Sequence, residues 1–205
     1  MILRVMRGRG GRDRVVSLHD ALHTELRSSG PERRGPERFH VGWRPTTAAA
    51  AASRAAEADR DVVVVSHWAS AEAAAQADVT QTSPYAIAMR HLGEIEVVHF
   101  EVDESIRRHS DDQPVAIRLA TGRFSKPGAD AEMQNLLRQR APLIGDEMAE
   151  AWVGRRLAGR AVEVTFVSTW RRLPDDRRLD EAFWPDIALR YDQFAVEVYS
   201  PVSVE

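Results

Sequence analysis

The seven histidines are the side chains of this 205-residue sequence best suited to acid–base chemistry, and all of them lie between residues 19 and 109. A neutral imidazole can take a proton from a phenol near neutral pH, and it can also bind heme iron. For this chemistry His91, in the segment Ile87–His91 that is expected to belong to the helix after Trp68, is the leading catalytic candidate. The structural alternative is a histidine at a helix end whose charge complements the last carbonyl groups.

Two tryptophans end β-branched segments, Trp68 after Asp61–His67 and Trp170 after Ala161–Thr169. Both are interpreted as core residues that also offer a rigid aromatic wall to a flat ligand. His67 precedes Trp68 and is therefore expected on the opposite face of the strand. It is either a hydrogen-bonded core histidine or a catalytic group.

Four further residues are predicted near these candidates. Tyr85 and Trp43 are expected to line a ligand pocket together with Trp68 and His91. Arg90 beside His91 and Arg190 beside Tyr191 recur at matched places, where they either hold an anion or form a salt bridge that fixes a helix.

Metal and nucleotide cofactors are not predicted. His19 and His23 share one helix face, but no glutamate lies between them and no third zinc ligand is evident. The absence of cysteine excludes disulfides, thiolate metal sites and iron–sulfur clusters. The run Gly8–Gly11 lacks the third glycine and the distal acid of a dinucleotide fingerprint.

Composition favours a cytoplasmic protein without membrane or nucleic-acid partners. The net charge is −3, and the arginines between residues 4 and 14 have no interleaved aromatic residues that could stack bases. No apolar run approaches the roughly 20 residues of a membrane span. The first residues do not resemble a secretory signal.

An internal repeat organises the elements that must position these candidates. Three blocks recur in the same order: Leu3–Arg9 with Ile117–Arg123, Val65–Trp68 with Val167–Trp170, and Ile87–His91 with Ile187–Tyr191. A weaker block pairs Val41–Arg44 with Val153–Arg156 at a spacing of 112 residues, and the spacing falls to 102 at Val65–Trp68. This drop assigns an insertion of about ten residues to the Ala-rich tract 46–59 of the first copy. We therefore predict two units, 1–109 and 110–205, joined through the polar segment Ser105–Pro114.

Periodicity predicts the same elements in each copy. Val15, Leu18, Leu22 and Leu26 have helical spacing within Asp13–Arg27, and so do Met133, Leu136, Leu137 and Arg140 within Ala129–Ala141. The order strand, helix, two strands, helix, strand is the ferredoxin-like βαββαβ unit, with helices on one face of the sheet. The predicted fold class is α+β, with tandem units packed sheet to sheet as an intrachain dimeric α+β barrel.

Duplicated ferredoxin-like units in which Val-Ser-X-Trp precedes a helix resemble the antibiotic biosynthesis monooxygenase (ABM) group of the dimeric α+β barrels. The resemblance covers nearly the whole chain twice, and it implies a pocket between each sheet and its helices with the tryptophan on the wall. A heme-degrading branch pairs that tryptophan with a histidine and an asparagine. Trp68 and His91 match the first two, but the first strand offers no asparagine, and Tyr191 replaces the histidine in the second copy.

The resemblance implies an ABM-like monooxygenase or related oxidoreductase that acts on a hydrophobic or aromatic small molecule without a nucleotide cofactor. The alternative is a non-catalytic small-molecule-binding or heme-binding protein of the same fold. We expect the larger pocket in the first copy, because His67 and His91 stand where the second copy has Thr169 and Tyr191. A monomer suffices for a barrel built from one chain, and a homodimer is allowed.

Overall fold

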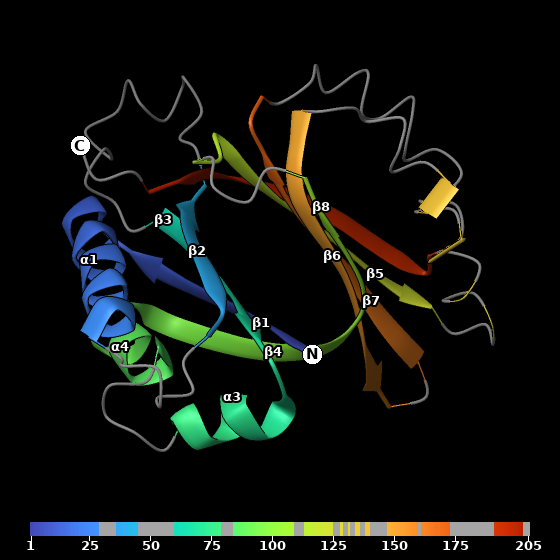
Figure 1. The fold of residues 1–205 in the computed structure, drawn as a ribbon, viewed down its shortest axis with the longest axis horizontal. Helices are drawn as coiled ribbons and strands as arrows, with labels where there is room; N and C mark the ends of the chain where they lie inside the picture. The colour runs from blue at the N-terminus through green and yellow to red at the C-terminus, as the bar shows by residue number, and fades with distance from the viewer. Residues whose placement is uncertain are drawn as a thin grey trace. The chain divides into compact units, whose positions relative to one another are not determined.

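The computed structural model divides the chain into two compact units, residues 1–99 with 199–205 (unit 1) and residues 100–198 (unit 2). Figure 1 labels the helices and strands. The residues that the structure describes are 1–28, 36–44, 60–78, 84–108, 113–124, 128, 131, 134–135, 138–139, 147–159, 161–172 and 191–202. The predicted insertion 46–59, His109 and Arg190 lie outside them.

Unit 1 has the predicted order of elements. They are β1 (Ile2–Gly10), α1 (Arg12–Ser28), β2 (Arg38–Trp43), β3 (Arg60–Trp68), α3 (Ala71–Asp78), α4 (Pro84–His91) and the first part of β4 (Gly93–Arg107). The strands lie in the order β4-β1-β3-β2-β8, where β8 contributes its last residues. Strand β3 pairs antiparallel with both β1 and β2, so its run of four valines is enclosed between two neighbours.

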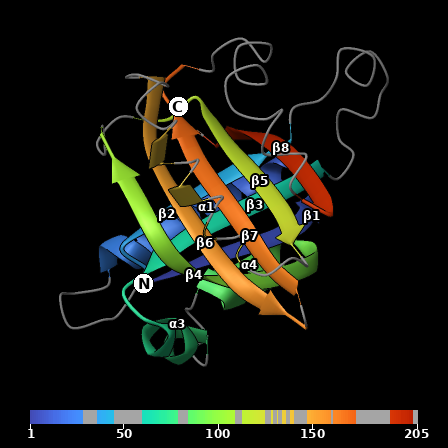
Figure 2. The same cartoon turned by 90° about the vertical axis from the view of Figure 1, so that its right-hand side faces the viewer.

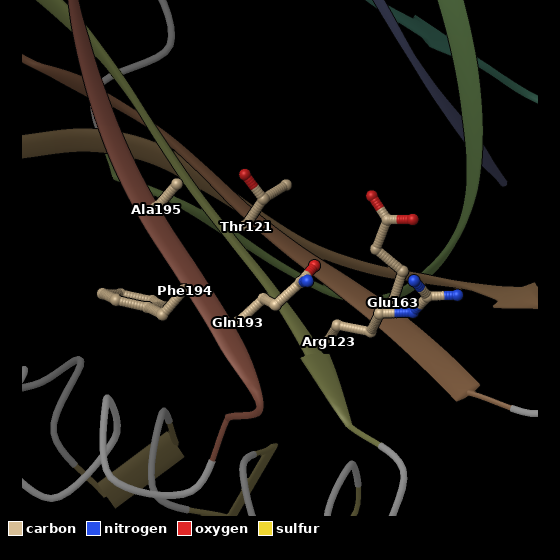
Figure 3. A pocket seen from close by; sticks show the side chains of 7 residues that line it. Thr121, Arg123, Glu163, Gln193, Phe194 and Ala195 are labelled. Atoms are coloured by element: carbon tan, nitrogen blue, oxygen red, sulfur yellow. The ribbon is translucent and has the colours of Figure 1, made fainter.

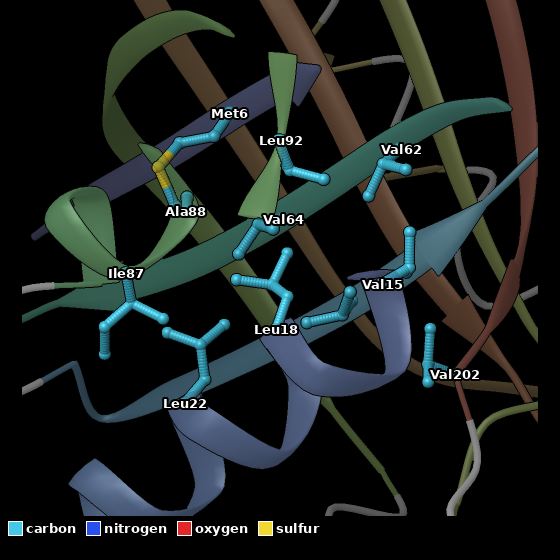
Figure 4. Packing of buried hydrophobic residues seen from close by; sticks show 11 residues of the cluster. Met6, Val15, Leu18, Leu22, Val62, Val64, Ile87, Ala88, Leu92 and Val202 are labelled. Carbon is cyan, nitrogen blue, oxygen red and sulfur yellow. The ribbon is translucent and has the colours of Figure 1, made fainter. Parts of the chain in front are cut away.

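Helices α1 and α4 cover one face of this sheet. Val15, Leu18 and Leu22 follow one another at helical spacing and are all buried. They pack with Ile87 of α4 and Val64 of β3, as Figure 4 shows. The helix predicted over Asp13–Arg27 is therefore confirmed, and its apolar stripe builds the core between sheet and helices.

Unit 2 repeats the strands. They are β5 (Ala116–Phe124), β6 (Met148–Ala158), β7 (Ala161–Trp170), the first part of β8 (Gln193–Pro201) and the end of β4, in the order β4-β6-β7-β5-β8. Figure 2 shows β7 between β5 and β6, with which it pairs antiparallel. Within the predicted helix 129–141 the described residues 131, 134–135 and 138–139 are helical, whereas Met133, Leu136, Leu137 and Arg140 lie outside the description.

Strand β4 is longer than its sequence indicated. A strand over Ile95–Val102 and a linker from Ser105 were expected, but β4 continues to Arg107 and pairs with β6 from Glu101 onward. Its charged residues are accommodated because Asp103 and Glu104 form ion pairs with Arg155 and Arg138. With eight strands and three helices in the described residues, the fold class is α+β, as predicted.

Candidate functional site

The two Val-Ser-X-Trp motifs build the same local arrangement. The indole Nε1 of Trp68 donates a hydrogen bond to Ser66 Oγ at 3.0 Å, and that of Trp170 donates to Ser168 Oγ at 2.9 Å. Residues two apart on a strand share a face, so each serine lies beside its tryptophan. Both tryptophans end the third strand of their unit and are buried. Each indole N–H is thereby satisfied within the core.

Trp68 is enclosed by Arg4 and helix α3. The Arg4 guanidinium lies over the indole ring, 4.7 Å from its centroid. Arg4 Nη2 donates to the Ala74 carbonyl oxygen and Nε donates to His99 Nε2, both at 2.9 Å. Ala73 and Ala74 of α3 belong to the same buried cluster as Trp68. Trp68 is therefore a core residue in this structure, and its face is occupied by a buried arginine.

His67 lies on the other face of β3, as expected from the strand geometry. Its side chain is buried, and Nδ1 lies 3.2 Å from a carboxylate oxygen of Glu37.

His91 is partly buried at the end of α4. Burial, and secondarily the charge of Arg90, lower the pKa of His91 from its ordinary value of 6.5, so the imidazole is neutral at pH 7. Arg90 itself is exposed. Tyr85 and Trp43 pack against the core cluster around α1 and α4, which is separate from the cluster of Trp68.

A pocket with a volume of about 270 Å³ lies in unit 2. Figure 3 shows the side chains that line it, which come from β5, β7 and β8. They are Thr121, Gly122, Arg123, Glu163, Gln193, Phe194 and Ala195. None of the predicted site residues is among them. The internal repeat carried a signal for two, because Gly122 and Arg123 match Gly8 and Arg9.

The Glu163 carboxylate has a fixed position at this pocket. Arg156 binds it through Nε at 2.9 Å and through Nη2 at 2.7 Å. Both nitrogens contact the same carboxylate oxygen, Oε2, so the ion pair anchors that oxygen. Arg123 is exposed and supplies a cation, while Thr121 and Gln193 can donate and accept hydrogen bonds. The pocket therefore suits a small ligand that combines an apolar ring with oxygen substituents.

Tyr191 packs against Phe194 and Gly122, two of the residues that line the pocket. Its ring stacks on Phe124 with a centroid distance of 4.1 Å and lies 5.0 Å from the ring of Phe194. A Cβ at residue 122 would overlap the Tyr191 ring, so only glycine leaves room for it there. Burial raises the pKa of Tyr191 above its ordinary value. Trp170 belongs to the cluster against which Tyr191 packs.

Heme and metal ions do not fit the pocket by its residue types. Heme iron takes axial ligands from histidine, cysteine, methionine or tyrosine, and the lining contains none of these. The described residues also contain no group of three histidine, aspartate or glutamate side chains placed to hold a metal ion. No described helix is long and apolar enough to cross a membrane.

Comparison with solved structures shows what this architecture is. A candidate monooxygenase from Fusobacterium nucleatum aligns over 100% of this chain and 93% of its own, with a TM-score of 0.67 and 13% identity. A candidate monooxygenase from Lactobacillus acidophilus aligns over 100% and 99%, with a TM-score of 0.61 and 9% identity. An anthrone oxidase-like protein aligns over 98% and 91%, with a TM-score of 0.57 and 10% identity.

The fold is that of the dimeric α+β barrels. The resemblance predicted from the Val-Ser-X-Trp motifs is confirmed at the level of the fold. No family model matches the sequence, and no curated protein is significantly similar to it. At 9 to 13% identity, these dimeric α+β barrels share an architecture with the chain and assign it no activity.

Proposed function

We propose that this protein is an ABM-like monooxygenase that binds a hydrophobic aromatic small molecule in the unit 2 pocket, without a nucleotide cofactor. The pocket itself carries the proposal, because it combines the Phe194 ring with a cation at Arg123 in a volume of about 270 Å³. An aromatic ligand can pack on Phe194 while a deprotonated oxygen faces Arg123. The candidate monooxygenases that share the fold support the reaction class.

The reaction needs no external reductant. An activated ring methylene and dioxygen give a ring carbonyl and water, so the substrate supplies the electrons. Loss of a methylene proton forms an enolate, whose electron pair reduces dioxygen. One oxygen atom stays in the carbonyl and the other leaves as water. In this pocket Arg123 would stabilise the enolate oxygen, and Glu163 is the lining carboxylate that can accept the proton.

Anthrone is a suitable probe, because its central methylene is activated and its rings are flat. We expect anthrone to bind the wild-type protein and to stimulate oxygen uptake. Arg123→Gln should lower the rate by on the order of 10²-fold, as loss of one oxyanion-stabilising donor does. Arg172→Gln is the matched control, since Arg172 is an exposed arginine of unit 2 that pairs with Glu147. Equal rates in the two variants would refute the assignment of the pocket.

His91 is the competing catalytic residue. Its lowered pKa keeps it neutral and able to accept a proton, but it belongs to α4 in unit 1. His91→Ala distinguishes the two sites. Under the pocket proposal this variant keeps its rate of oxygen uptake. A fall in that rate as large as the fall in Arg123→Gln would instead indicate that His91 is the catalytic residue.

A second candidate function is binding without turnover. It is favoured by the lining residues, which include no histidine, and by the ion pair that holds Glu163 against Arg156. Anthrone binding that depends on Arg123, without oxygen uptake, would support it. An absorbance titration with hemin tests the heme-binding alternative, for which a Soret shift abolished by His91→Ala is the expected sign.

A further inference from the structure

Two arginines of unit 1 share one aromatic ring. Arg12 begins α1 and Arg60 begins β3, and their guanidinium carbons lie 5.9 and 5.8 Å from the ring centroid of Trp43. Trp43 ends β2 and is half-buried against the unit 1 core. The ring fixes both cations by cation–π attraction. The sequence showed no aromatic residue among its N-terminal arginines, and the fold supplies one from a distant strand.

Arg12 and Arg60 differ from nearby arginines in that no carboxylate among the described residues forms an ion pair with them. Arg44 pairs with Asp61 at 3.0 Å, and Arg9 lies 4.0 Å from Glu94. Within the part of the chain that the structure describes, neither Arg12 nor Arg60 forms an ion pair with a carboxylate. An indole ring attracts a guanidinium but does not neutralise its charge. Among the residues that the structure describes, two arginines without a carboxylate partner thus lie against one ring of unit 1.

A phosphate group matches this pair of charges. A guanidinium presents parallel N–H groups that bind two phosphate oxygens at once, and its charge persists at every physiological pH. A phosphate monoester carries up to two negative charges near neutral pH, which two arginines can balance. The positive end of the α1 helix, at Arg12, adds to the same field. Together these groups favour a multiply charged oxyanion over a single carboxylate.

We propose that Arg12 and Arg60, held on Trp43, form a binding site for the phosphate group of a small phosphorylated molecule. A small ligand is favoured over a nucleic acid, because a polyanion needs a stripe of cations and the chain has a net charge of −3. The site lies in unit 1 and shares no residue with the unit 2 pocket. Its existence is therefore independent of the proposed oxygenase function.

Isothermal titration of the full chain with pyrophosphate at low ionic strength tests the site. We expect saturable binding to the wild type and a loss of affinity of about tenfold or more in Arg12→Ala and in Arg60→Ala. Arg60→Lys keeps the charge but loses the fork, so it should bind with intermediate affinity. Arg172→Ala, which removes an arginine from unit 2, should bind as the wild type does.

Two further arms complete the experiment. Trp43→Phe keeps a ring under the guanidinium groups and should retain binding, whereas Trp43→Leu should weaken it. Circular dichroism confirms that each variant is folded before titration. Equal affinities of the wild type and Arg12→Ala would overturn the proposal. A heat of titration that sodium chloride of equal ionic strength reproduces would also overturn the proposal. Binding of a single-stranded oligonucleotide without binding of pyrophosphate would overturn it as well.

Discussion

At the scale of single residues, the indole–serine hydrogen bond appears twice, and it links Trp68 to Ser66 and Trp170 to Ser168. Truncation of either tryptophan to alanine removes a fully buried aromatic side chain. We expect each truncation to lower the free energy of unfolding by about 3–5 kcal/mol, measured by urea denaturation.

The serines provide the matched test of the hydrogen bond itself. Ser66→Ala and Ser168→Ala each leave a buried indole N–H without its acceptor, which should cost about 1–3 kcal/mol. In the Trp68→Phe background, which has no indole N–H, Ser66→Ala should lower the free energy of unfolding by less than it does in the wild type. A cost that is the same in both backgrounds would show that the hydrogen bond does not contribute.

Gly122 is a second residue whose role can be isolated. Its missing side chain leaves the space that the Tyr191 ring fills. Gly122→Ala should displace that ring and lower the stability by about 1–3 kcal/mol, as overpacking of a core does. In the Tyr191→Ala background the added methyl group meets no ring, so Gly122→Ala should cost much less. Urea denaturation of the four proteins in this double-mutant cycle measures the difference.

His91 makes the stability depend on pH in a defined direction. Its pKa is lowered in the folded state, first by burial and then by Arg90, so folding favours the neutral imidazole. This contribution is complete above about pH 6.5, the ordinary pKa, and is lost as the pH falls through the lower folded-state pKa. The wild type should therefore lose more stability between pH 7 and pH 5 than His91→Gln does.

Proton NMR gives an independent check of the same titration. The imidazole signal that disappears in His91→Gln should titrate below pH 6.5 in the wild type, and Arg90→Gln should move its midpoint upward. A midpoint at or above 6.5 would contradict the assigned environment.

At the scale of elements, the two β-branched strands were predictable and the unit 2 pocket was not. Asp61–Trp68 and Ala161–Trp170 were placed correctly, because a run of β-branched residues is a local signal. The expectation that each strand has a single apolar face was wrong, since Val62–Trp68 and Val164–Trp170 are buried on both faces. The extension of β4 was missed, since alternating charged residues resemble a linker until partners such as Arg155 are known. The pocket was missed because its lining comes from three strands, and the prediction followed the histidines, which lie elsewhere.

Arg4 joins three elements of unit 1, since β1 carries it, α3 accepts its Nη2 hydrogen bond and β4 carries His99. Arg4→Met keeps much of the side-chain volume but loses both hydrogen bonds. We expect it to cost about 3 kcal/mol, since hydrogen bonds from charged groups contribute about 1.5–3 kcal/mol each. Hydrogen exchange should then accelerate in α3 before α1, whose packing does not involve Arg4. Equal acceleration in both helices would contradict this linkage.

At the scale of the whole molecule, β4 and β8 each contribute residues to both units. Strand β4 passes from unit 1 to unit 2 between His99 and Phe100, and β8 returns to unit 1 at Tyr199. The last residues of the described chain therefore complete the unit that begins at Met1. Gly42 pairs with Pro201, and Val202 donates a backbone hydrogen bond to the Val41 carbonyl at 2.9 Å.

Because the end of β8 belongs to unit 1, we expect the stability of unit 1 to depend on residues 199–202. A chain that ends after Val198 loses the buried side chains of Tyr199 and Val202 together with Ser200 and Pro201, the β8 residues that pair with β2. Burial of two such side chains contributes about 3–6 kcal/mol, so the urea midpoint should fall markedly. A chain that ends after Val202 keeps these contacts and serves as the control. If both shortened chains unfold at the same urea concentration, the end of β8 does not stabilise unit 1, because only the first chain lacks the β8 residues that pair with β2.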